Sequence, residues 1–379
     1  MKKKVLFIMS SLGGGGAEKV LVTMLKNFNY DRFDVSLALT TYAGIYLNEL
    51  PPQVKVIPIY KRPGTLLEKL GFQLYSRLGI SCLEKWSARR AIKGKYDAIV
   101  SFMQGRALKF HGYLLDRGGK NLSWIHCDMS ARRVSVGAVL SEKDEKRCYE
   151  SMDEVVFVSK EAQTQFGKLR YSLKKSSVIY NPIPVEEIQK YLGTASSKET
   201  NPASEGGINI VLCGSLSPVK AFDRMVKVAD RLKKEGLQFQ INIIGEGPER
   251  GKLESLIDEL GLKGVVNLLG FLRPPYAEMV KGDMFVSCSL TEAYPLNVCE
   301  AICLGLPIVA TECSGNSEVL GYGKYGLLVG QDEDELYEAI KQMITSESLR
   351  DEYAEKSKEG AKLFDMDKVM SEVYGVLND

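Results

Sequence analysis

The sequence has little histidine and no pattern typical of a metal site. It holds only two histidines, His111 and His126, and its eight cysteines lack the paired spacing of a zinc site. No run of 18 or more apolar residues occurs, so no membrane-spanning helix is expected. The MKKK start is too short for a signal peptide. With 45% hydrophobic and 26% charged residues, the chain is predicted to be a soluble cytoplasmic protein with buried, reduced thiols and no metal.

A complete dinucleotide-binding fingerprint is also missing. Four consecutive glycines, Gly13 to Gly16, stand between a strand-like run and a helical pattern. The fingerprint would need a third glycine at position 18 or 19, where Glu18 and Lys19 stand. This argues against an NAD enzyme. The glycines could let backbone N–H groups approach a ligand, or they could simply form the tight turn that a strand–helix unit needs.

The small net charge conceals two halves of opposite sign. Residues 1–185 hold 30 Lys+Arg and 16 Asp+Glu (+14), and residues 186–379 hold 20 and 32 (−12), which sum to the net +2 of the chain. A basic half predicts an anionic ligand or surface. No nucleic-acid-binding module accompanies the charge, so nucleic acid is not expected and a membrane or lipid phosphate fits better.

Residues 61–93 interleave large apolar side chains with Lys and Arg. Such a basic, aromatic-bearing amphipathic stretch can lie in a membrane interface. The alternative is a helix packed on a sheet, with its charged face in water. Together with the basic N-terminal half, the stretch predicts peripheral binding to an anionic membrane, at the inner face of the plasma membrane.

Strand-like and helix-like segments alternate along most of the chain, as in 4–10 followed by a loop and helix within 11–28, or in the strand, loop and helix of 208–232. This alternation predicts an α/β fold with parallel, doubly wound sheets. A length of 379 residues suffices for two such domains. Residues 192–207 are rich in Ser, Thr, Gly and Pro and are predicted to form a loop.

The stretch 289–301, SLTEAYPLNVCEA, is the strongest candidate for a functional site. Glu292 and Glu300 stand eight positions apart with Pro295 between them, and an apolar helical pattern follows. Proline is favoured where a helix begins, and the free N–H groups there attract anions. A sugar nucleotide fits this arrangement, with its diphosphate at the helix N-terminus and its ribose and sugar hydroxyls on the two carboxylates. Charged helices also supply such glutamate pairs by chance.

Four segments together resemble a known family. The run EAYPLNVCE is similar to the paired-glutamate motif of the retaining GT-B glycosyltransferases of glycosyltransferase family 4. The glycine run GGGGAE, the segment VIYNPIP at 178–184 and the segment GSLSPVKAF at 214–222 also resemble parts of that family. In the last segment Lys220 occupies the family's lysine position, but Ser215 replaces an arginine and Ala221 a glycine. The alternative for Lys220 is a surface lysine ahead of a helix.

The resemblance implies a GT-B fold, with two facing Rossmann-like domains and the active site in the interdomain cleft. Residues 1–183 would bind the acceptor, a C-terminal helix at 366–379 would pack back on them, and residues 184–365 would bind the nucleotide sugar. The implied reaction is metal-independent, cofactor-free, retaining transfer from a nucleotide sugar, expected to be UDP-linked. From the basic N-terminal half, the expected acceptor is lipid-linked or an oligosaccharide, in cell-surface polysaccharide biosynthesis.

The resemblance also assigns residues. His126, after an apolar strand, Lys220 and Glu292 are the candidate catalytic groups, acting by positioning and by stabilising charge. Glu300 is assigned to the ribose. The predicted donor-binding residues are Gly15, Gly16, Gly214, Ser215, Lys220, Gly245, Gly270, Phe271, Leu272, Glu292, Ala293, Pro295, Leu296, Asn297, Val298 and Glu300. The acidic string Asp332–Asp334 is predicted to open a helix rather than to hold a metal.

Two other functions remain compatible with these patterns. A GT-B sugar-nucleotide epimerase would share the architecture but would act on the donor without an acceptor. A non-catalytic, membrane-docked binding protein would keep the basic half but would not need both glutamates and Lys220.

Overall fold

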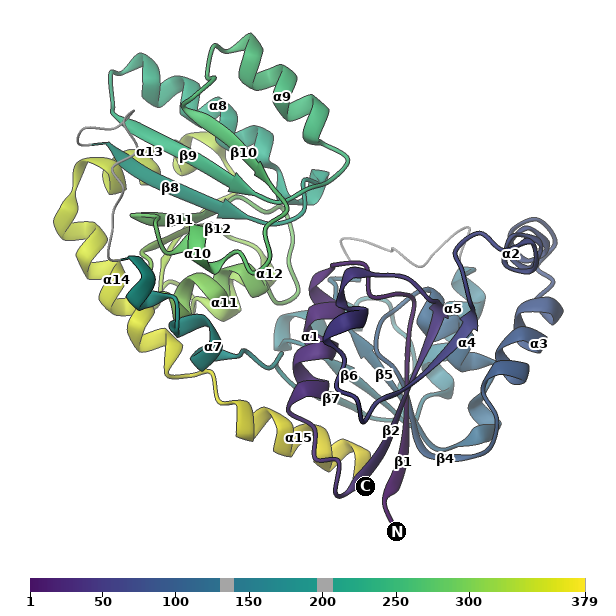
Figure 1. Cartoon of the computed structure of the whole chain (residues 1–379). Coiled ribbons are helices and arrows are strands. Elements are labelled where there is room, and N and C mark those ends of the chain that lie inside the picture. Colours follow the sequence, from purple (N-terminus) through teal and green to yellow (C-terminus); the bar gives the residue numbers. More distant parts are fainter. Residues whose placement is uncertain (130–139, 196–206, 379) are drawn as a thin grey trace. The chain divides into compact units, whose positions relative to one another are not determined.

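The computed structural model describes residues 1–129, 140–195 and 207–378, which form two compact units (Figure 1). Unit 1 comprises Met1–Pro182 and Met366–Asp379, and unit 2 comprises Ile183–Asp365. Most of the loop predicted at 192–207 lies outside the described residues; Leu192–Ala195 form a short 3₁₀ helix, η3.

Unit 1 is built on a seven-stranded parallel sheet in the order β3-β2-β1-β4-β5-β6-β7. The interior strand at Lys3–Met9 is apolar on both faces, because helices cover both sides of a parallel sheet, and its Val5 to Met9 are fully buried. The strands are β1 (Lys3–Met9), β2 (Phe33–Thr41), β3 (Lys55–Tyr60), β4 (Tyr96–Ser101), β5 (Gly118–Ile125), β6 (Glu154–Phe157) and β7 (Ser176–Val178).

The helices of unit 1 connect these strands in chain order. They are α1 (Gly16–Lys26), η1 (Ile45–Glu49), α2 (Leu66–Leu78), α3 (Cys82–Ala91), α4 (Arg106–Gly112), η2 (Leu115–Arg117), α5 (Glu142–Ser151) and α6 (Lys160–Gly167), with α15 (Met366–Asn378) added from the far end of the chain.

Unit 2 repeats this plan on a six-stranded parallel sheet in the order β10-β9-β8-β11-β12-β13. Its strands are β8 (Ile208–Cys213), β9 (Phe239–Ile244), β10 (Val266–Gly270), β11 (Met284–Ser287), β12 (Ile308–Thr311) and β13 (Leu327–Val329). Its helices are α7 (Val185–Gln189), η4 (Pro218–Lys220), α8 (Phe222–Lys234), α9 (Arg250–Glu259), α10 (Tyr276–Met279), α11 (Leu296–Cys303), α12 (Ser314–Val319), α13 (Glu333–Thr345) and α14 (Glu347–Ala361). The prediction of parallel, doubly wound sheets is confirmed.

The strand order reverses direction once in each sheet. In unit 1 the chain builds outward from β1 to β3 and then returns to place β4 beside β1; in unit 2 it builds from β8 to β10 and returns to place β11 beside β8. Ligands of such sheets bind at the carboxyl ends of the strands where the order reverses. The loops after β8 and β11 therefore mark the expected site in unit 2, and those after β1 and β4 mark it in unit 1.

The last helix, α15, belongs to unit 1 although it follows unit 2 in the sequence. Tyr374 stacks on Phe33 with ring centroids 5.4 Å apart, and its hydroxyl donates to the carbonyl of Asn27 at 3.2 Å. The ammonium of Lys120 donates to the carbonyl of Val376 at 2.9 Å. Aromatic packing and a lysine at the carboxyl end of the helix therefore fasten α15 to the sheet.

The cysteines only partly match the prediction of buried thiols. All eight are free, and Cys148, Cys288, Cys299 and Cys303 are buried. Cys82 is exposed, because it starts α3 at the surface of unit 1 and does not lie in an apolar interior pattern.

Candidate active site

The loops after β8 and β11 meet at an ion pair. The ammonium of Lys220, at the end of η4, contacts Oε1 of Glu292 in the loop before α11. The hydroxyl of Ser289 donates to the same carboxylate oxygen at 2.8 Å. The structure thus brings together two of the three predicted catalytic residues, 72 positions apart in the sequence.

This pair is shielded but still reachable from solvent. The side chains of Lys220 and Glu292 are 16% and 15% exposed. Burial by itself would lower the pKa of Lys220, but the charge of Glu292 and the hydrogen bond between them outweigh burial and raise that pKa. Lys220 is therefore a cation at every physiological pH.

Three glycines allow backbone segments to approach closely around this corner. A Cβ atom on Gly245 would lie 1.8 Å from the carbonyl oxygen of Gly214, and one on Gly247 would lie 2.3 Å from that of Leu216. A Cβ on Gly214 would lie 3.2 Å from Cε of Lys220. Any side chain at 245 or 247 would push the loop after β9 away from the loop after β8.

The amino end of α11 opens beside Glu292. Pro295 is the N-cap residue, one position before the first turn in which it was predicted, and its carbonyl receives the first helical bond, from the N–H of Cys299 at 3.1 Å. The amides of the first turn consequently have no acceptor within the helix. The side-chain amide of Asn297 donates to the carbonyl of Cys213 at 2.6 Å, which ties α11 to the end of β8. Glu300 follows in the second turn and is 5% exposed.

The carboxyl end of β10 carries the residues predicted to contact the base. Gly270 has φ +79°, and the next side chain, Phe271, is 49% exposed, whereas Leu272 is partly buried. The carbonyl of Gly270 accepts the N–H of Gly245 at 2.8 Å. Since β10 lies two strands from β8, about 10 Å separates Phe271 from the Lys220 corner along the sheet edge.

The two departures from the family pattern have local consequences. Ala221 has φ +49°, the left-handed conformation that favours glycine, so the turn between η4 and α8 keeps its shape despite the alanine. The hydroxyl of Ser215 lies 3.2 Å from that of Ser217. Serine supplies no charge here, so the one cation of this segment is Lys220.

The glycine loop of unit 1 is bonded to its own helix. The N–H groups of Gly14 and Gly15 donate to Oε2 of Glu18 at 2.5 and 2.8 Å, and Gly16 begins α1. Glu18 thus accepts from the N-cap amide of α1, as the acidic member of a capping box does, while the N-cap glycine has no side chain to return a bond. The predicted approach of Gly15 and Gly16 to a donor stays a prediction, and the Gly15 amide would have to exchange Glu18 for the ligand.

His126 directly follows β5, as predicted, and lies beside Phe102 with ring centroids 4.8 Å apart. Its Nε2 is buried and has no hydrogen-bond partner among the described residues. Burial lowers the pKa of His126 to about 3, so the imidazole is neutral at physiological pH. His111, by contrast, lies inside unit 1 with both ring nitrogens bonded, one to Ser101 and one to Asn121, which is a structural role.

Two residues of the site received no role from the sequence. Ser289 orients Glu292, and Ser314, at the start of α12, donates through its hydroxyl to the carbonyl of Glu292 at 2.9 Å. A Cβ on the next residue, Gly315, would lie 2.8 Å from that carbonyl. The only sequence signal is the position of both serines two or three residues after strands β11 and β12, at the ligand-binding edge.

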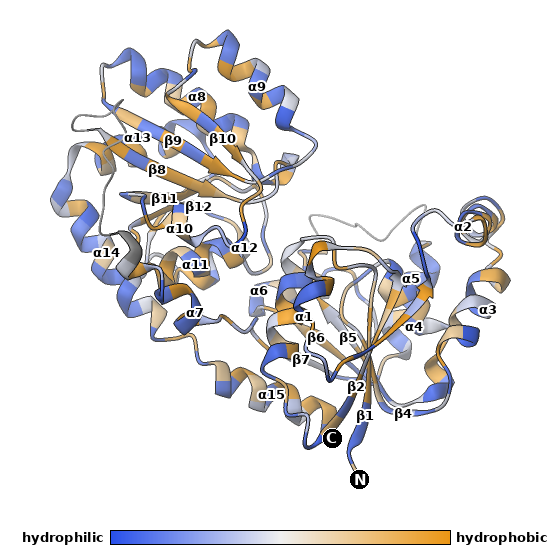
Figure 2. Cartoon of the chain, viewed as in Figure 1, coloured by the Kyte–Doolittle hydropathy of each residue, from blue (hydrophilic) through white to orange (hydrophobic). Residues whose placement is uncertain are grey.

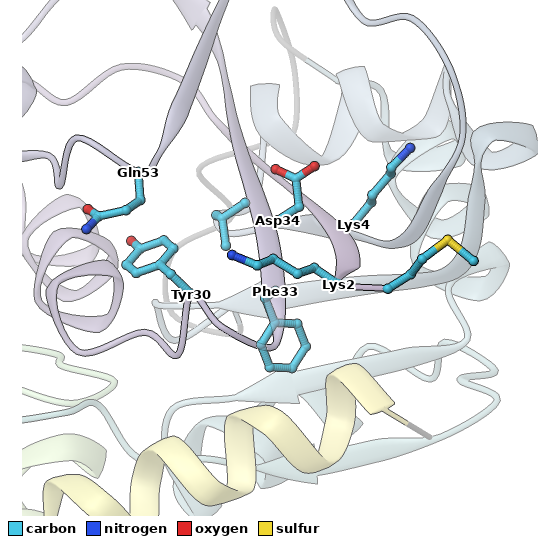
Figure 3. A pocket seen from close by; sticks show the side chains of 8 residues that line it. Lys2, Lys4, Tyr30, Phe33, Asp34 and Gln53 are labelled. Carbon is cyan, nitrogen blue, oxygen red and sulfur yellow. The ribbon is translucent and has the colours of Figure 1, made fainter.

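Other surface features carry no comparable chemistry. A cavity of about 470 Å³ in unit 1, lined by Lys2, Lys4, Tyr30, Phe33 and Asp34 among others (Figure 3), lies at the amino ends of β1 and β2, away from the ligand-binding edge. The acidic string at 332–334 opens α13 as predicted, with the carboxylate of Asp332 accepting the N–H of Asp334 at 2.7 Å.

The second half of the chain matches a family model. Residues 194–360 match the model described as Glycosyl transferases group 1. This region belongs to that family. It contains the Lys220–Glu292 pair, α11 and the end of β10, so every predicted donor-binding residue outside the glycine loop of unit 1 lies within the group 1 region.

Curated relatives agree with this membership. An enzyme of Campylobacter jejuni, N-acetylgalactosamine-N,N'-diacetylbacillosaminyl-diphospho-undecaprenol 4-alpha-N-acetylgalactosaminyltransferase, is 33% identical over 201 residues, 52% of each chain. A second Campylobacter jejuni relative, an alpha-1,4-N-acetyl-D-galactosaminyltransferase acting on a diphospho-undecaprenol-linked glycan by its name, is 24% identical over 97% of this chain and 96% of its own. The match to the first relative spans about half its length.

Solved structures share the whole fold. HepE of Anabaena in complex with UDP-glucose superposes with a TM-score of 0.74 over 99% of both chains at 20% identity. WaaG, a glycosyltransferase involved in lipopolysaccharide biosynthesis, gives 0.71 at 16% identity, again over 99% of both. The prediction of a GT-B fold is confirmed.

Proposed function

We propose that this protein is a retaining glycosyltransferase that moves a sugar from a UDP-linked donor to a lipid-linked or oligosaccharide acceptor. The observation that carries the proposal is the contact between Lys220 and Glu292 beside the amino end of α11, at the strand-order reversal of the group 1 region. One cation, one carboxylate and free helix amides converge there, which is the set that a sugar diphosphate requires.

Each residue then has a role in the reaction. The diphosphate binds the first amides of α11 and the ammonium of Lys220, which together offset the charge that develops as the bond between the sugar carbon and the phosphate oxygen breaks. Glu292 accepts a hydrogen bond from the transferred sugar, and Glu300 accepts from the ribose. His126, being neutral, can exchange hydrogen bonds with a sugar hydroxyl through its unpartnered Nε2.

The same arrangement explains how the configuration is retained without a protein nucleophile. The acceptor oxygen bonds to the sugar carbon from the side that the diphosphate leaves, and its proton passes to the departing phosphate oxygen. Lys220 and the helix dipole supply the positive charge for this step, so we propose that no divalent ion is needed. Activity should then persist in a chelator.

The acceptor class is inferred from chemistry and from relatives. Two Campylobacter relatives have names that specify acceptors linked to diphospho-undecaprenol. The first half of this chain carries a net charge of +14 by the count above, which suits a diphosphate-linked lipid. We therefore propose a role in the assembly of a surface polysaccharide on a lipid carrier.

The test is transfer to a polyprenyl-diphosphate-linked acceptor from a panel of UDP- and GDP-sugars, read by mass spectrometry, with the anomeric configuration assigned by NMR. The expected result is one added sugar with the donor's configuration, abolished in Lys220→Ala. Donor incubated without acceptor is the control, because a new epimer there would identify an epimerase. Failure of UDP to bind at millimolar concentration would overturn the proposal.

A further inference from the structure

Helix α2 turns polar residues toward its own unit. Its buried positions are Glu68, Gly71 and Tyr75. The carboxylate of Glu68 accepts the hydroxyl of Thr41 at 2.8 Å and pairs with the guanidinium of Arg106 at 2.7 Å. The hydroxyl of Tyr75 donates to Asp144 at 2.7 Å. Besides the packing of Leu67 against the core, these hydrogen bonds and this ion pair hold the inner face of the helix.

Helix α3 is held in the same way. Its Glu84 pairs with Lys109 of α4 at 2.6 Å, and both side chains are only 3% exposed. The ammonium of Lys109 also lies 3.2 Å from the centre of the Tyr75 ring, and the hydroxyl of Tyr113 donates to Glu84 at 3.1 Å. The two acidic residues between positions 61 and 95, Glu68 and Glu84, are therefore both buried and paired inside the unit.

Several exposed positions of this helix pair carry large apolar side chains. Of the fourteen large apolar side chains that are exposed in the described chain, six fall within positions 66–86: Leu66, Leu70, Phe72, Leu78, Ile80 and Trp86. Leu66 and Leu70 stand one helical turn apart, on the side opposite Glu68 and Tyr75. Figure 2 shows α2 and α3 at the margin of unit 1, outside α4. Leu67 and Ala88 also pack inward, but buried glutamates inside and several large apolar side chains outside depart from the pattern of an ordinary surface helix.

The exposed charged residues within this stretch of the sequence have one sign. The exposed charged residues from 61 to 93 are Lys61, Arg62, Lys69, Arg77, Lys85, Arg90 and Lys93. The guanidinium of Arg90 lies 5.0 Å from the centre of the Trp86 ring, so it also covers part of that side chain. Apolar groups ringed by cations match the phosphate and acyl boundary of an anionic bilayer.

We propose that the outer face of α2 and α3 binds the surface of an anionic lipid bilayer. Leu66, Leu70, Leu78 and Trp86 enter the acyl boundary, and the surrounding lysines and arginines bind lipid phosphates. The binding is independent of sugar transfer, since none of these residues belongs to the group 1 region. It would hold the carboxyl edge of the unit 1 sheet near a membrane, because Glu68 of α2 bonds directly to Thr41 at the end of β2.

The chain offers an internal reporter for this binding. It has two tryptophans; Trp86 is 49% exposed and Trp124 is 2% exposed. Phosphatidylcholine vesicles with and without phosphatidylglycerol are titrated into the full chain. We expect a blue shift of tryptophan emission only with the anionic vesicles, lost in Trp86→Phe and weakened by salt.

Flotation of the same vesicles measures binding directly. The variant Leu66→Ser/Leu70→Ser and the variant Lys69→Glu/Arg77→Glu should each weaken binding by at least tenfold. The matched controls, Leu363→Ser and Lys168→Glu, replace exposed residues elsewhere and should bind as the unaltered chain does. The melting temperature of every variant shows whether it is folded, and a UDP titration shows whether it still binds nucleotide. A variant that passes both tests but binds vesicles weakly has lost membrane binding alone.

Three results would overturn the proposal. They are equal binding to neutral and anionic vesicles, unaltered binding by both double variants, and a concentration-dependent dimer that Leu66→Ser/Leu70→Ser dissociates. The last would make a second copy of the chain the partner of this face.

Discussion

The ammonium of Lys220 is bound by the carboxylate of Glu292, the residue that we expect to contact the transferred sugar. A diphosphate that binds Lys220 must therefore compete with Glu292. Glu292 holds the lysine in position for the donor. Because Lys220 is expected to bind the diphosphate and Glu292 the sugar, replacing each residue in turn tests the two roles separately.

Removing each partner should have different effects. Lys220→Ala should weaken UDP binding about 10- to 100-fold, because a charge-assisted contact is lost. Glu292→Gln should leave UDP binding unchanged or tighter, since it frees the lysine, while transfer falls about 100-fold. Calorimetry and steady-state kinetics measure both. Equal loss of UDP affinity in the two variants would refute this division.

Glu300 should govern recognition of the ribose. Glu300→Ala is expected to raise the donor KM about 10- to 100-fold, because hydrogen bonds to a carboxylate are lost. The control is the ligand: a 2′,3′-dideoxy analogue of UDP should bind the variant and the unaltered chain equally. An unchanged KM would remove the assignment.

The close approach of Gly245 to the carbonyl of Gly214 should make this glycine irreplaceable. Gly245→Ala should lower the free energy of unfolding by more than about 2 kcal/mol, since either backbone must move. Gly251→Ala is the matched control in α9, where a Cβ meets nothing within 4 Å, and it should stabilise by about 0.5–1 kcal/mol. Urea denaturation measures both, and similar values for the two would contradict the packing argument.

Ala221 should tolerate glycine unusually well. Its φ of +49° is strained for alanine, so Ala221→Gly is expected to leave stability unchanged or to raise it by up to about 1 kcal/mol. Ala354→Gly, within α14, should instead cost about 1 kcal/mol. A loss at 221 as large as that at 354 would show that the turn is not strained.

Acidification should destabilise the protein below about pH 6.5. Burial lowers the pKa of His111 to about 4, although its hydrogen bond to Asn121 opposes this. Between pH 6.5 and 4 the unfolded chain therefore binds a proton that the folded chain does not, so the free energy of unfolding falls as the pH falls. Between pH 6 and 5 the contribution of His111 is about 1 kcal/mol. His126, whose pKa burial lowers to about 3, contributes to the same slope. His111→Gln should therefore reduce the slope in urea titrations without abolishing it, and an unchanged slope would exclude His111 as a source.

The sequence was sufficient for features that depend on local patterns. The strands around Val5 and Ile210 are short apolar runs followed by glycine loops, and such runs predict buried parallel strands. Glu292, Pro295 and Glu300 lie within nine positions, so one helix start fixes their order along the chain. These parts of the fold and site could be predicted without coordinates.

Features that depend on distant partners could not be predicted. Nothing near Lys220 in the sequence indicates that Glu292 neutralises its charge. The position of Glu18 after the glycine loop likewise does not show that its carboxylate accepts hydrogen bonds from the loop's amides. Helix α2 presents the same difficulty. Its helical period identifies two faces, but only the contacts of Glu68 and Tyr75 show that the polar face is the inner one.

Because α15 packs on the first unit, that unit can finish folding only when both ends of the polypeptide have been synthesised. Phe33 of β2 is translated early, yet its stacking partner Tyr374 leaves the ribosome only after the whole second unit. The aromatic surface around Phe33 therefore stays exposed on the first unit until synthesis of the chain is complete. A fragment cut at the boundary after Pro182 would keep that surface bare, and it should aggregate unless the thirteen residues of α15 are supplied as a peptide.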